Sequence, residues 1–212
     1  VNIHKECQVY FNMVKYPSSL QNLIECFKKL PGVGERTAER YALSFLSLDE
    51  DSINIFAQSM KDVHVKIRRC DKCNNYSEGE LCEICKDQSR VQKTICVVEE
   101  PKSIISFERA GAFQGVYHVL DGLISPSDGI NPDDINLSSL IKRIENDQIE
   151  EVIIAVRPCA EGEITAMYIA KKLESYQVKV TKIAYGIPLG ADMGYMDPLT
   201  LEISLENRQK LS

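Results

Sequence analysis

The sequence predicts a multidomain α/β protein: an N-terminal pair of helices, a small four-cysteine knot, an α/β domain with a parallel sheet, and a C-terminal extension. Three observations predict it. Two amphipathic helical patterns flank a proline–glycine turn before residue 47, four cysteines form two Cys-x-x-Cys pairs, and short apolar runs alternate with helical patterns after residue 94. With 212 residues, the chain can hold one or two ordinary domains plus a small module.

The first helical pattern covers residues 20–27 and is followed by a second over residues 38–46. Ser18 or Ser19 can cap the first helix, Pro31 ends it, and Gly32 and Gly34 permit a tight turn with open backbone N–H groups. Both patterns place apolar side chains at helical spacing: Leu20, Leu23, Ile24 and Phe27 in the first, and Ala38, Tyr41, Ala42, Phe45 and Leu46 in the second.

Two helices joined by Leu30-Pro-Gly-Val-Gly34 resemble the helix–hairpin–helix of DNA-binding proteins. Glycine N–H groups at a helix N-terminus favour a phosphate oxygen, and arginines four residues apart can reach neighbouring phosphates. Such contacts predict sequence-nonspecific, salt-sensitive binding. The alternative is an ordinary helical hairpin with solvated arginines, and a later basic run is equally open between a solvated face and a DNA contact. The predicted DNA-binding residues are Arg36, Arg40, Gly32, Gly34 and Lys28; the basic run is Lys61, Lys66, Arg68, Arg69 and Lys72.

The most secure site prediction is one structural zinc ion bound by Cys70, Cys73, Cys82 and Cys85. A spacing of two residues within each pair lets both thiolates reach one ion, and four thiolates leave no open position for catalysis. The alternative is a set of buried or redox-active thiols. The knot is too small to fold without its metal, and it lies between the helical hairpin and the α/β part, so we expect a rigid joint.

The sequence after residue 94 predicts a parallel sheet with helices on both faces. The predicted strands are residues 95–98, 116–120, 152–156 and 178–184, and the predicted helices are residues 102–110, 137–144 and 164–176, with Gly111 ending the first. Three glutamates, Glu99, Glu161 and Glu163, follow the ends of two of these strands. Sites in open α/β sheets form at that edge.

This layout resembles a Toprim domain, the module shared by topoisomerases, bacterial primases and some nucleases. The resemblance implies that Glu99 and an acidic pair hold Mg²⁺ for phosphoryl chemistry. The match is partial, because the usual Asp-x-Asp is Glu161-x-Glu163 here. Solvated strand-end acids or helix N-terminal charges are an equal alternative to a Mg²⁺ site, and a partner's basic patch is another ligand for the same acids.

The charge and composition of the chain narrow the classes of protein to which it can belong. The net charge is −6, yet residues 1–72 hold 11 Lys+Arg against 9 Asp+Glu, so nucleic acid should meet the first third of the chain. No apolar run approaches the roughly 18 residues of a membrane helix, and residues 1–12 lack the apolar core of a secretory signal. We therefore expect a cytoplasmic protein without a disulfide framework.

The order of these parts over residues 15–212 resembles the RecR family of bacterial recombination mediators. One departure is Arg157-Pro-Cys-Ala160, where the family commonly has Asn-Pro-Thr and an apolar residue. The strings that carry the resemblance are Tyr16-Pro-Ser-Ser-Leu20, Leu30-Pro-Gly-Val-Gly34, Thr94-Ile-Cys-Val-Val-Glu-Glu-Pro101, Tyr117-His-Val-Leu120, Ser125-Pro126, Glu161-Gly-Glu163 and Tyr185-Gly-Ile-Pro-Leu-Gly190.

The resemblance implies a non-enzymatic, nucleoid-associated repair protein. It would act with RecO- and RecF-type partners at single-strand gaps and single/double-strand junctions, load a recombinase, and form dimers and DNA-encircling tetramers. The implied organisation is a leader or expression-derived segment (1–15), a helix–hairpin–helix domain (16–68), a four-cysteine zinc finger (69–88), a Toprim-like domain (92–187) and an oligomerisation arm (188–212). In that arm Leu199, Leu201, Ile203 and Leu205 alternate, which predicts a strand or extended segment, or else a strand and short helix packed on the same chain.

Two other hypotheses remain at this point. The first is a Mg²⁺-dependent Toprim enzyme, such as a nuclease, primase or topoisomerase fragment, that uses Glu99, Glu161 and Glu163. The second is a zinc-braced interaction scaffold that does not contact DNA. Strand cleavage or synthesis that disappears in Glu163→Gln would identify the enzyme, and DNA binding that survives reversal of Arg36 and Arg40 would identify the scaffold.

Overall fold

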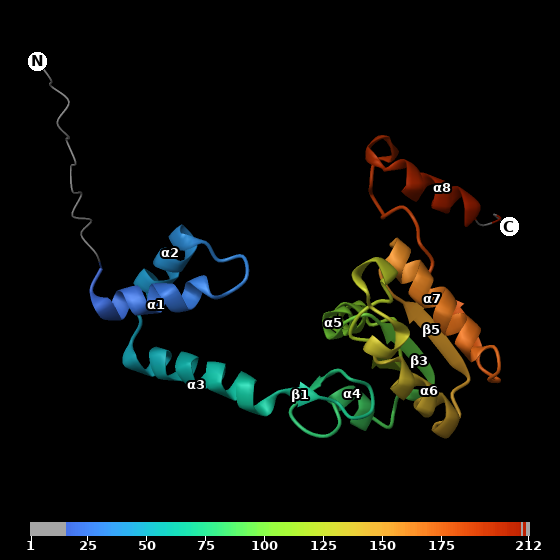
Figure 1. The fold of residues 1–212 in the computed structure, drawn as a ribbon, viewed down its shortest axis with the longest axis horizontal. Helices are drawn as coiled ribbons and strands as arrows, with labels where there is room; N and C mark the ends of the chain where they lie inside the picture. Colours follow the sequence, from blue (N-terminus) through green and yellow to red (C-terminus); the bar gives the residue numbers. More distant parts are fainter. Residues whose placement is uncertain (1–15, 209, 211–212) are drawn as a thin grey trace, which may run out of the picture. The chain divides into compact units, whose positions relative to one another are not determined.

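The computed structural model describes residues 16–208 and residue 210 (Figure 1). The expectation of a leader at residues 1–15 lies outside the described residues. The chain divides into two compact units after Val65.

The first unit consists of three helices: α1 (Ser18–Lys28), α2 (Glu35–Phe45) and α3 (Glu50–Lys66). The predicted helical hairpin is therefore confirmed. Its core is small, because only Ile24, Ala38 and Ala42 are fully buried among the described residues of this unit. The predicted serine cap is wrong: α1 begins after Pro17 without a side-chain cap, since the fixed φ of proline already suits a helix start.

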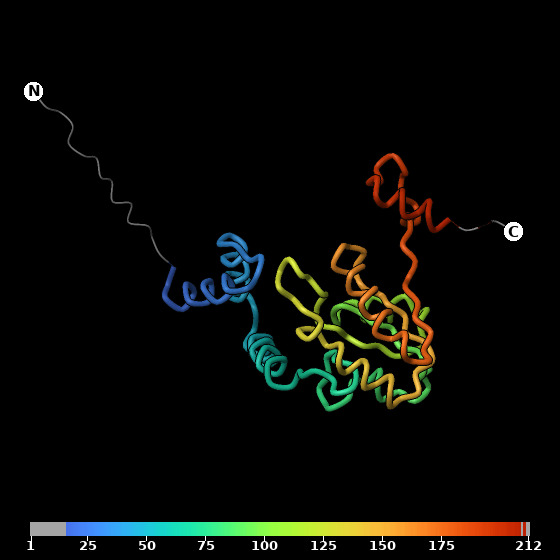
Figure 2. The backbone as a smooth tube through the Cα atoms, turned by 45° about the vertical axis from the view of Figure 1, so that its right-hand side comes forward, coloured from blue at the N-terminus to red at the C-terminus, as the bar shows by residue number. Residues whose placement is uncertain are grey.

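The second unit begins with the cysteine knot, which holds β1 (Arg68–Arg69), β2 (Tyr76–Ser77) and the single helical turn α4 (Glu83–Lys86). The two short strands pair in antiparallel fashion, with Arg69 opposite Tyr76. Asn74 closes the first cysteine turn with a φ of 62°, a left-handed conformation that asparagine tolerates better than most residues. Figure 2 follows the chain from this knot into the main sheet.

The main sheet has four parallel strands in the order β4-β3-β5-β6. All four strands were predicted from the sequence, and the parallel sheet is confirmed. Their bounds are β3 (Val91–Val98), β4 (Gly115–Val119), β5 (Glu151–Ala155) and β6 (Lys179–Lys182). The register places Val98 of β3 opposite Ala155 of β5, so the residues that follow these two strands lie at one edge of the sheet.

Helices cover both faces of this sheet, as expected. The larger core lies under α6 (Leu137–Asn146) and α7 (Ala160–Leu173), whose apolar sides pack on Ile95, Val97 and Ile154. The smaller core lies under α5 (Pro101–Ala110), where Ile104 packs with Val98 and Tyr117. Gly111 ends α5 in the left-handed conformation, at a φ of 66°.

The C-terminal segment corrects a prediction, because residues Pro198–Glu206 form helix α8 instead of a strand. Asp197 caps it by accepting from the Thr200 N–H at 2.9 Å, and Pro198 occupies the first helical position. These start signals outweigh the apolar alternation that predicted a strand. Short 3₁₀ turns complete the unit: Pro126–Asp128, Pro132–Asp134 and Met193–Tyr195. None of the helices in the described part of the chain has the length and apolar character needed to span a membrane.

Candidate nucleic-acid interface and zinc centre

The turn between α1 and α2 exposes the start of a helix. Gly32 has a φ of 78°, which an L side chain rarely adopts, so this glycine is required by the turn. Gly34 is the residue before α2, and it supplies no side-chain cap to the first N–H groups of that helix. These N–H groups carry the positive end of the helix dipole and can bind an anion.

Arg36 and Arg40 lie on the exposed side of α2, as predicted. Neither forms an ion pair with any described residue, and the Arg40 guanidinium lies 5.5 Å from the centre of the Tyr41 ring. Lys28, by contrast, binds Glu35 at 2.7 Å and Glu25 at 3.1 Å, and these bonds raise its pKa, the one with Glu35 most. Lys28 therefore ties α1 to the start of α2 and is less available to a phosphate than the two arginines.

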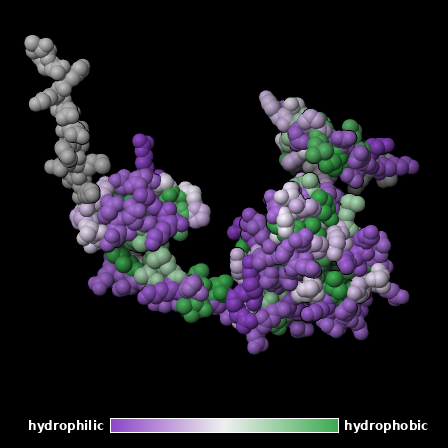
Figure 3. All heavy atoms as spheres, in the orientation of Figure 1, coloured by the Kyte–Doolittle hydropathy of each residue, from purple (hydrophilic) through white to green (hydrophobic). Residues whose placement is uncertain are grey.

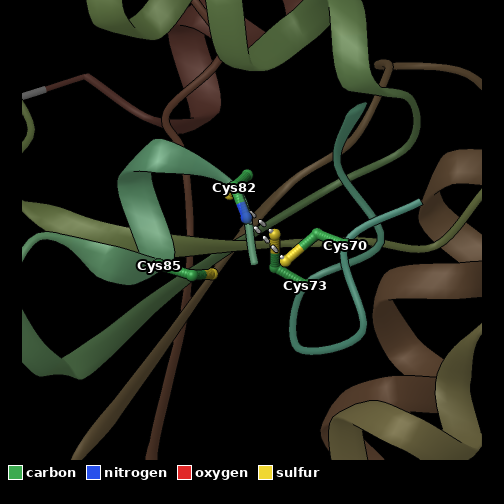
Figure 4. Close-up of side chains that lie close together, drawn as sticks. All are labelled: Cys70, Cys73, Cys82 and Cys85. Atoms are coloured by element: carbon green, nitrogen blue, oxygen red, sulfur yellow. Dashed lines mark hydrogen bonds between the residues drawn. The ribbon is translucent and has the colours of Figure 1, made fainter. Parts of the chain in front are cut away.

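The four predicted ligands converge on one point (Figure 4). The sulfur atoms of Cys70, Cys73, Cys82 and Cys85 all lie within 4.8 Å of one another, and all four side chains are buried. A thiolate set of this size matches tetrahedral zinc, whose bonds to sulfur are about 2.3 Å.

The thiols of this centre cannot all ionise without a cation. Hydrogen bonding with Cys82, whose sulfur is 3.5 Å away, raises the pKa of Cys73, and the same bond lowers the pKa of Cys82. The Cys82 backbone N–H also donates to the Cys70 sulfur at 3.3 Å. A divalent ion supplies the charge that lets four clustered thiolates coexist. The protein therefore has one closed structural zinc site.

Three hydrogen bonds attach this knot to the main sheet. The Val119 N–H, at the end of β4, donates to the Cys73 carbonyl at 2.9 Å, and the Asn74 amide donates to the Val119 carbonyl at 3.4 Å. Arg69 binds the Asp121 carboxylate at 2.7 Å. The backbone of the zinc ligand Cys73 thus bonds directly to the end of β4, which is consistent with the predicted rigid attachment of the knot to the α/β domain.

The carboxyl edge of the sheet places each predicted acid beside a different group. Arg157 binds both oxygens of Glu99, each at 2.7 Å, and Lys182 binds both oxygens of Glu163, at 2.8 and 2.9 Å. Glu161 forms no ion pair with a described residue. Its pKa is lowered, chiefly by its own backbone N–H at the start of α7 and then by the Cys159 thiol.

These contacts do not fit a Mg²⁺ site built from the three acids. Mg²⁺ is held by one or two carboxylates with free oxygens, and here Glu99 and Glu163 each give both oxygens to a cation of the chain. Among the described residues, the four cysteines are the only group of three or more metal-ligating side chains close enough to share an ion. We therefore derive no chemical step through magnesium.

Sequence reasoning named Arg157 only as a departure from the family pattern and Arg69 only as part of a basic run, and it did not name Lys182. Arg157 follows β5 and Lys182 ends β6, so strand-end position is the signal that identifies both. Asn74 and Asp121, which fasten the knot, both have positive φ, 62° and 64°, and a local Asn or Asp is weak evidence of that conformation.

Models of known protein families match the chain in the same order as the parts described above. The family models that match are the RecR helix-hairpin-helix over residues 20–64, the RecR four-cysteine zinc finger domain over 67–87, the Toprim domain over 93–184 and the RecR C-terminal model over 186–209. The chain is 44% identical over 200 residues to a protein of Prochlorococcus marinus (strain MIT 9312) named "Recombination protein RecR". It is 43% identical over 199 residues to the protein of the same name from Natranaerobius thermophilus. Each match covers 94% of this chain and 100% of the relative.

A helix–hairpin–helix, a structural four-cysteine zinc centre and a Toprim domain in one chain define a multidomain protein of the nucleic-acid-associated Toprim class. With both relatives matched along their whole length, the chain belongs to the RecR family.

Proposed function

We propose that this protein is a DNA-binding recombination mediator without catalytic turnover, acting in recombinational repair in the bacterial cytoplasm at the nucleoid. In this proposal it binds single/double-strand junctions and, with RecO- and RecF-type partners, helps load a recombinase at single-strand gaps. The observation that carries it is the hairpin of the first unit, where Arg36 and Arg40 remain free of internal ion pairs with described residues next to an uncapped helix start. The names of the relatives support the link to recombination.

The hairpin supports DNA binding without base specificity. An arginine that has no internal carboxylate partner can bind a phosphate without first breaking an ion pair. The N–H groups after Gly34 offer a second, neutral contact to the same backbone. Neither contact reads a base edge, so affinity should depend steeply on salt and little on sequence.

A ring of several copies reconciles DNA binding with a net charge of −6. Two arginines per chain give weak binding, and several copies around one DNA multiply it through effective concentration. A closed ring of dimers needs two different self-complementary interfaces. The chain has two separate apolar surfaces that support this.

The first apolar surface lies on the helical unit, where Figure 3 shows hydrophobic residues gathered along α3. It includes an apolar groove of about 540 Å³ whose lining includes Leu46, Phe56 and Met60. The second is α8 with the segment before it, where Leu189, Tyr195, Leu199 and Leu205 are exposed. Exposed apolar surface on this scale is typical of interaction sites. We assign the groove to one subunit contact and residues 188–212 to the other.

The carboxyl edge of the sheet is the proposed surface for a basic partner such as a RecO-type protein. Glu99 and Glu163 are already neutralised by Arg157 and Lys182, whereas Glu161 forms no ion pair with a described residue. Glu161 is therefore the acid best placed to bind a partner's lysine or arginine. The same pairing of the other two acids argues against the Toprim enzyme hypothesis.

The double reversal Arg36→Glu with Arg40→Glu tests this function. We expect DNA affinity for a gapped duplex to fall by about 100-fold or more at low salt, since two phosphate contacts become repulsive. The slope of log affinity against log salt should fall by about two. Fluorescence anisotropy measures both, and circular dichroism should show an unchanged fold, because both side chains are exposed.

The matched control is Arg109→Glu with Lys142→Glu, which makes the same change in net charge on α5 and α6 of the other unit. We expect this variant to retain most of its affinity. Equal losses in both variants would show that net charge alone governs binding and would contradict the hairpin as the interface. Light scattering with and without gapped DNA tests the ring, and a monomer in both states would refute it.

A further inference from the structure

The pair formed by Glu99 and Arg157 is unlike an ordinary surface ion pair. The Glu99 side chain is only 15% exposed, while the Arg157 side chain is 69% exposed. The carboxylate thus sits in the sheet edge and the guanidinium covers it from solvent. A bidentate arginine–carboxylate pair is the strongest geometry of this kind.

The backbone around Arg157 is built to hold that position. The Arg157 carbonyl accepts from the Cys159 N–H at 2.9 Å, which closes the loop after β5 tightly. The first turn of α7 then packs on this carbonyl so closely that a Cβ added at Gly162 would lie 1.9 Å from its oxygen. Gly162 therefore allows the loop and helix to approach and fixes the start of the Arg157 side chain.

A half-buried carboxylate needs a cation, and at this edge the chain supplies one of its own. We propose that Arg157 is a built-in counter-ion that takes the place of a divalent cation at Glu99, so that the Toprim edge of this protein works without metal. Lys182, at the end of the neighbouring strand β6, acts in the same way as a counter-ion for Glu163.

This assignment makes Arg157 the residue that determines whether Glu99 binds a metal ion or a side chain of the protein. With a guanidinium on both Glu99 oxygens, a metal ion must displace a positive charge that is held at 2.7 Å. Without it, the edge carries a half-buried carboxylate with two free oxygens, and carboxylate oxygens are ligands that hard cations prefer. The residue at position 157 thus decides whether Glu99 accepts a metal cation.

The test uses Mn²⁺ as a probe on the full-length, zinc-loaded protein, with binding followed by electron paramagnetic resonance of the free ion. We expect Arg157→Asn to bind Mn²⁺ at least about tenfold more tightly than the unmodified protein, because one opposing charge is removed from the site. Adding Glu99→Gln to that variant should abolish the gain. Arg157→Lys, which keeps the charge, should bind as weakly as the unmodified protein.

Lys179→Asn is the control, because it removes the cationic partner of a carboxylate that lies away from the proposed site. Lys179 binds Glu151 at 2.9 Å at the start of β5, so this variant frees a carboxylate at the opposite edge of the sheet and should show no gain. Unmodified protein that binds Mn²⁺ in a way lost in Glu99→Gln overturns the proposal. An Arg157→Asn variant that is folded by circular dichroism yet gains no Mn²⁺ binding also overturns it. A gain in Mn²⁺ binding that survives the added Glu99→Gln change does so too.

Discussion

The two units of this chain differ in where they place their apolar and charged side chains. Apart from α8 and the segment before it, the α/β unit buries two apolar layers against its sheet, and it pairs Glu99 and Glu163 at its carboxyl edge internally. The helical unit, in its described part, buries only Ile24, Ala38 and Ala42 fully, and it leaves Arg36, Arg40 and much of α3 exposed.

This difference separates two tasks within one small protein. A domain that satisfies its own groups is a stable scaffold and offers few free contacts. A unit that leaves apolar surface and cations exposed is suited to bind other molecules, and the proposed function assigns these to other copies of the chain and to DNA. We expect the scaffold to depend on its internal contacts and the helical unit to depend on its exposed ones.

The largest expected effect is that of Cys73→Ser, which removes a zinc ligand whose carbonyl also holds the end of β4. Structural zinc contributes about 10 kcal/mol or more in small zinc folds, so we expect the knot and the adjoining strand end to unfold. Metal analysis should show loss of zinc. Hydrogen exchange should show loss of protection in residues 66–86 and 115–121, while α1 and α2 keep theirs.

The control for this change is Cys26→Ser, which alters an exposed cysteine of the helical unit and should leave zinc content unchanged. A zinc-free Cys73→Ser protein with undiminished protection around β4 would show that the knot is an appendage and not part of the scaffold.

The same contrast explains what the sequence could and could not predict. The cysteine ligands, the helices and the parallel strands have local patterns, so they were predictable. Ion pairs such as Arg157 with Glu99 join residues 58 positions apart and depend on strand register, which no local pattern reveals. The alternating leucines before residue 206 misled because Asp197 and Pro198 start a helix there.

Acid should weaken the α/β unit through His118, which is fully buried on β4 and donates from Nε2 to the Asn136 carbonyl at 2.8 Å. Burial first, and the nearby Arg143 guanidinium as well, lower its pKa from 6.5 to about 4. The unfolded chain therefore binds this proton more readily than the folded one. Stability from this group is complete above about pH 6.5 and falls by about 3 kcal/mol as the pH approaches 4.

Chemical denaturation between about pH 7.5 and 4.5, with zinc content followed in parallel, measures this loss. His118→Gln keeps a donor for Asn136 but cannot be protonated, so its stability should decline less steeply across the same range. Identical pH profiles for the two proteins would show that His118 is not the source of the acid sensitivity.

A smaller effect is expected from Gly162→Ala, which tests how tightly the scaffold is packed beside Arg157. The new Cβ would lie 1.9 Å from the Arg157 carbonyl oxygen, so the loop or α7 must shift. Overpacking of this kind costs about 2 kcal/mol in the free energy of unfolding. Gly186→Ala is the control, because a Cβ there meets nothing within 4 Å. Equal melting temperatures in the two variants would show that the loop is not held against the helix.

The smallest effect on stability is expected at the exposed groove of the helical unit. A pair of matched substitutions there and on α7 tests the difference between the two units most directly. Met60→Ser changes a groove residue that is 58% exposed, and Met167→Ser makes the same change on α7, where the methionine is 71% exposed. Both should alter the free energy of unfolding by less than about 0.5 kcal/mol, as surface substitutions usually do. Only Met60→Ser should shift the oligomer towards smaller species in light scattering over a dilution series. Because the two changes match in chemistry, a shift in both or in neither would show that the groove on α3 is not a contact between subunits.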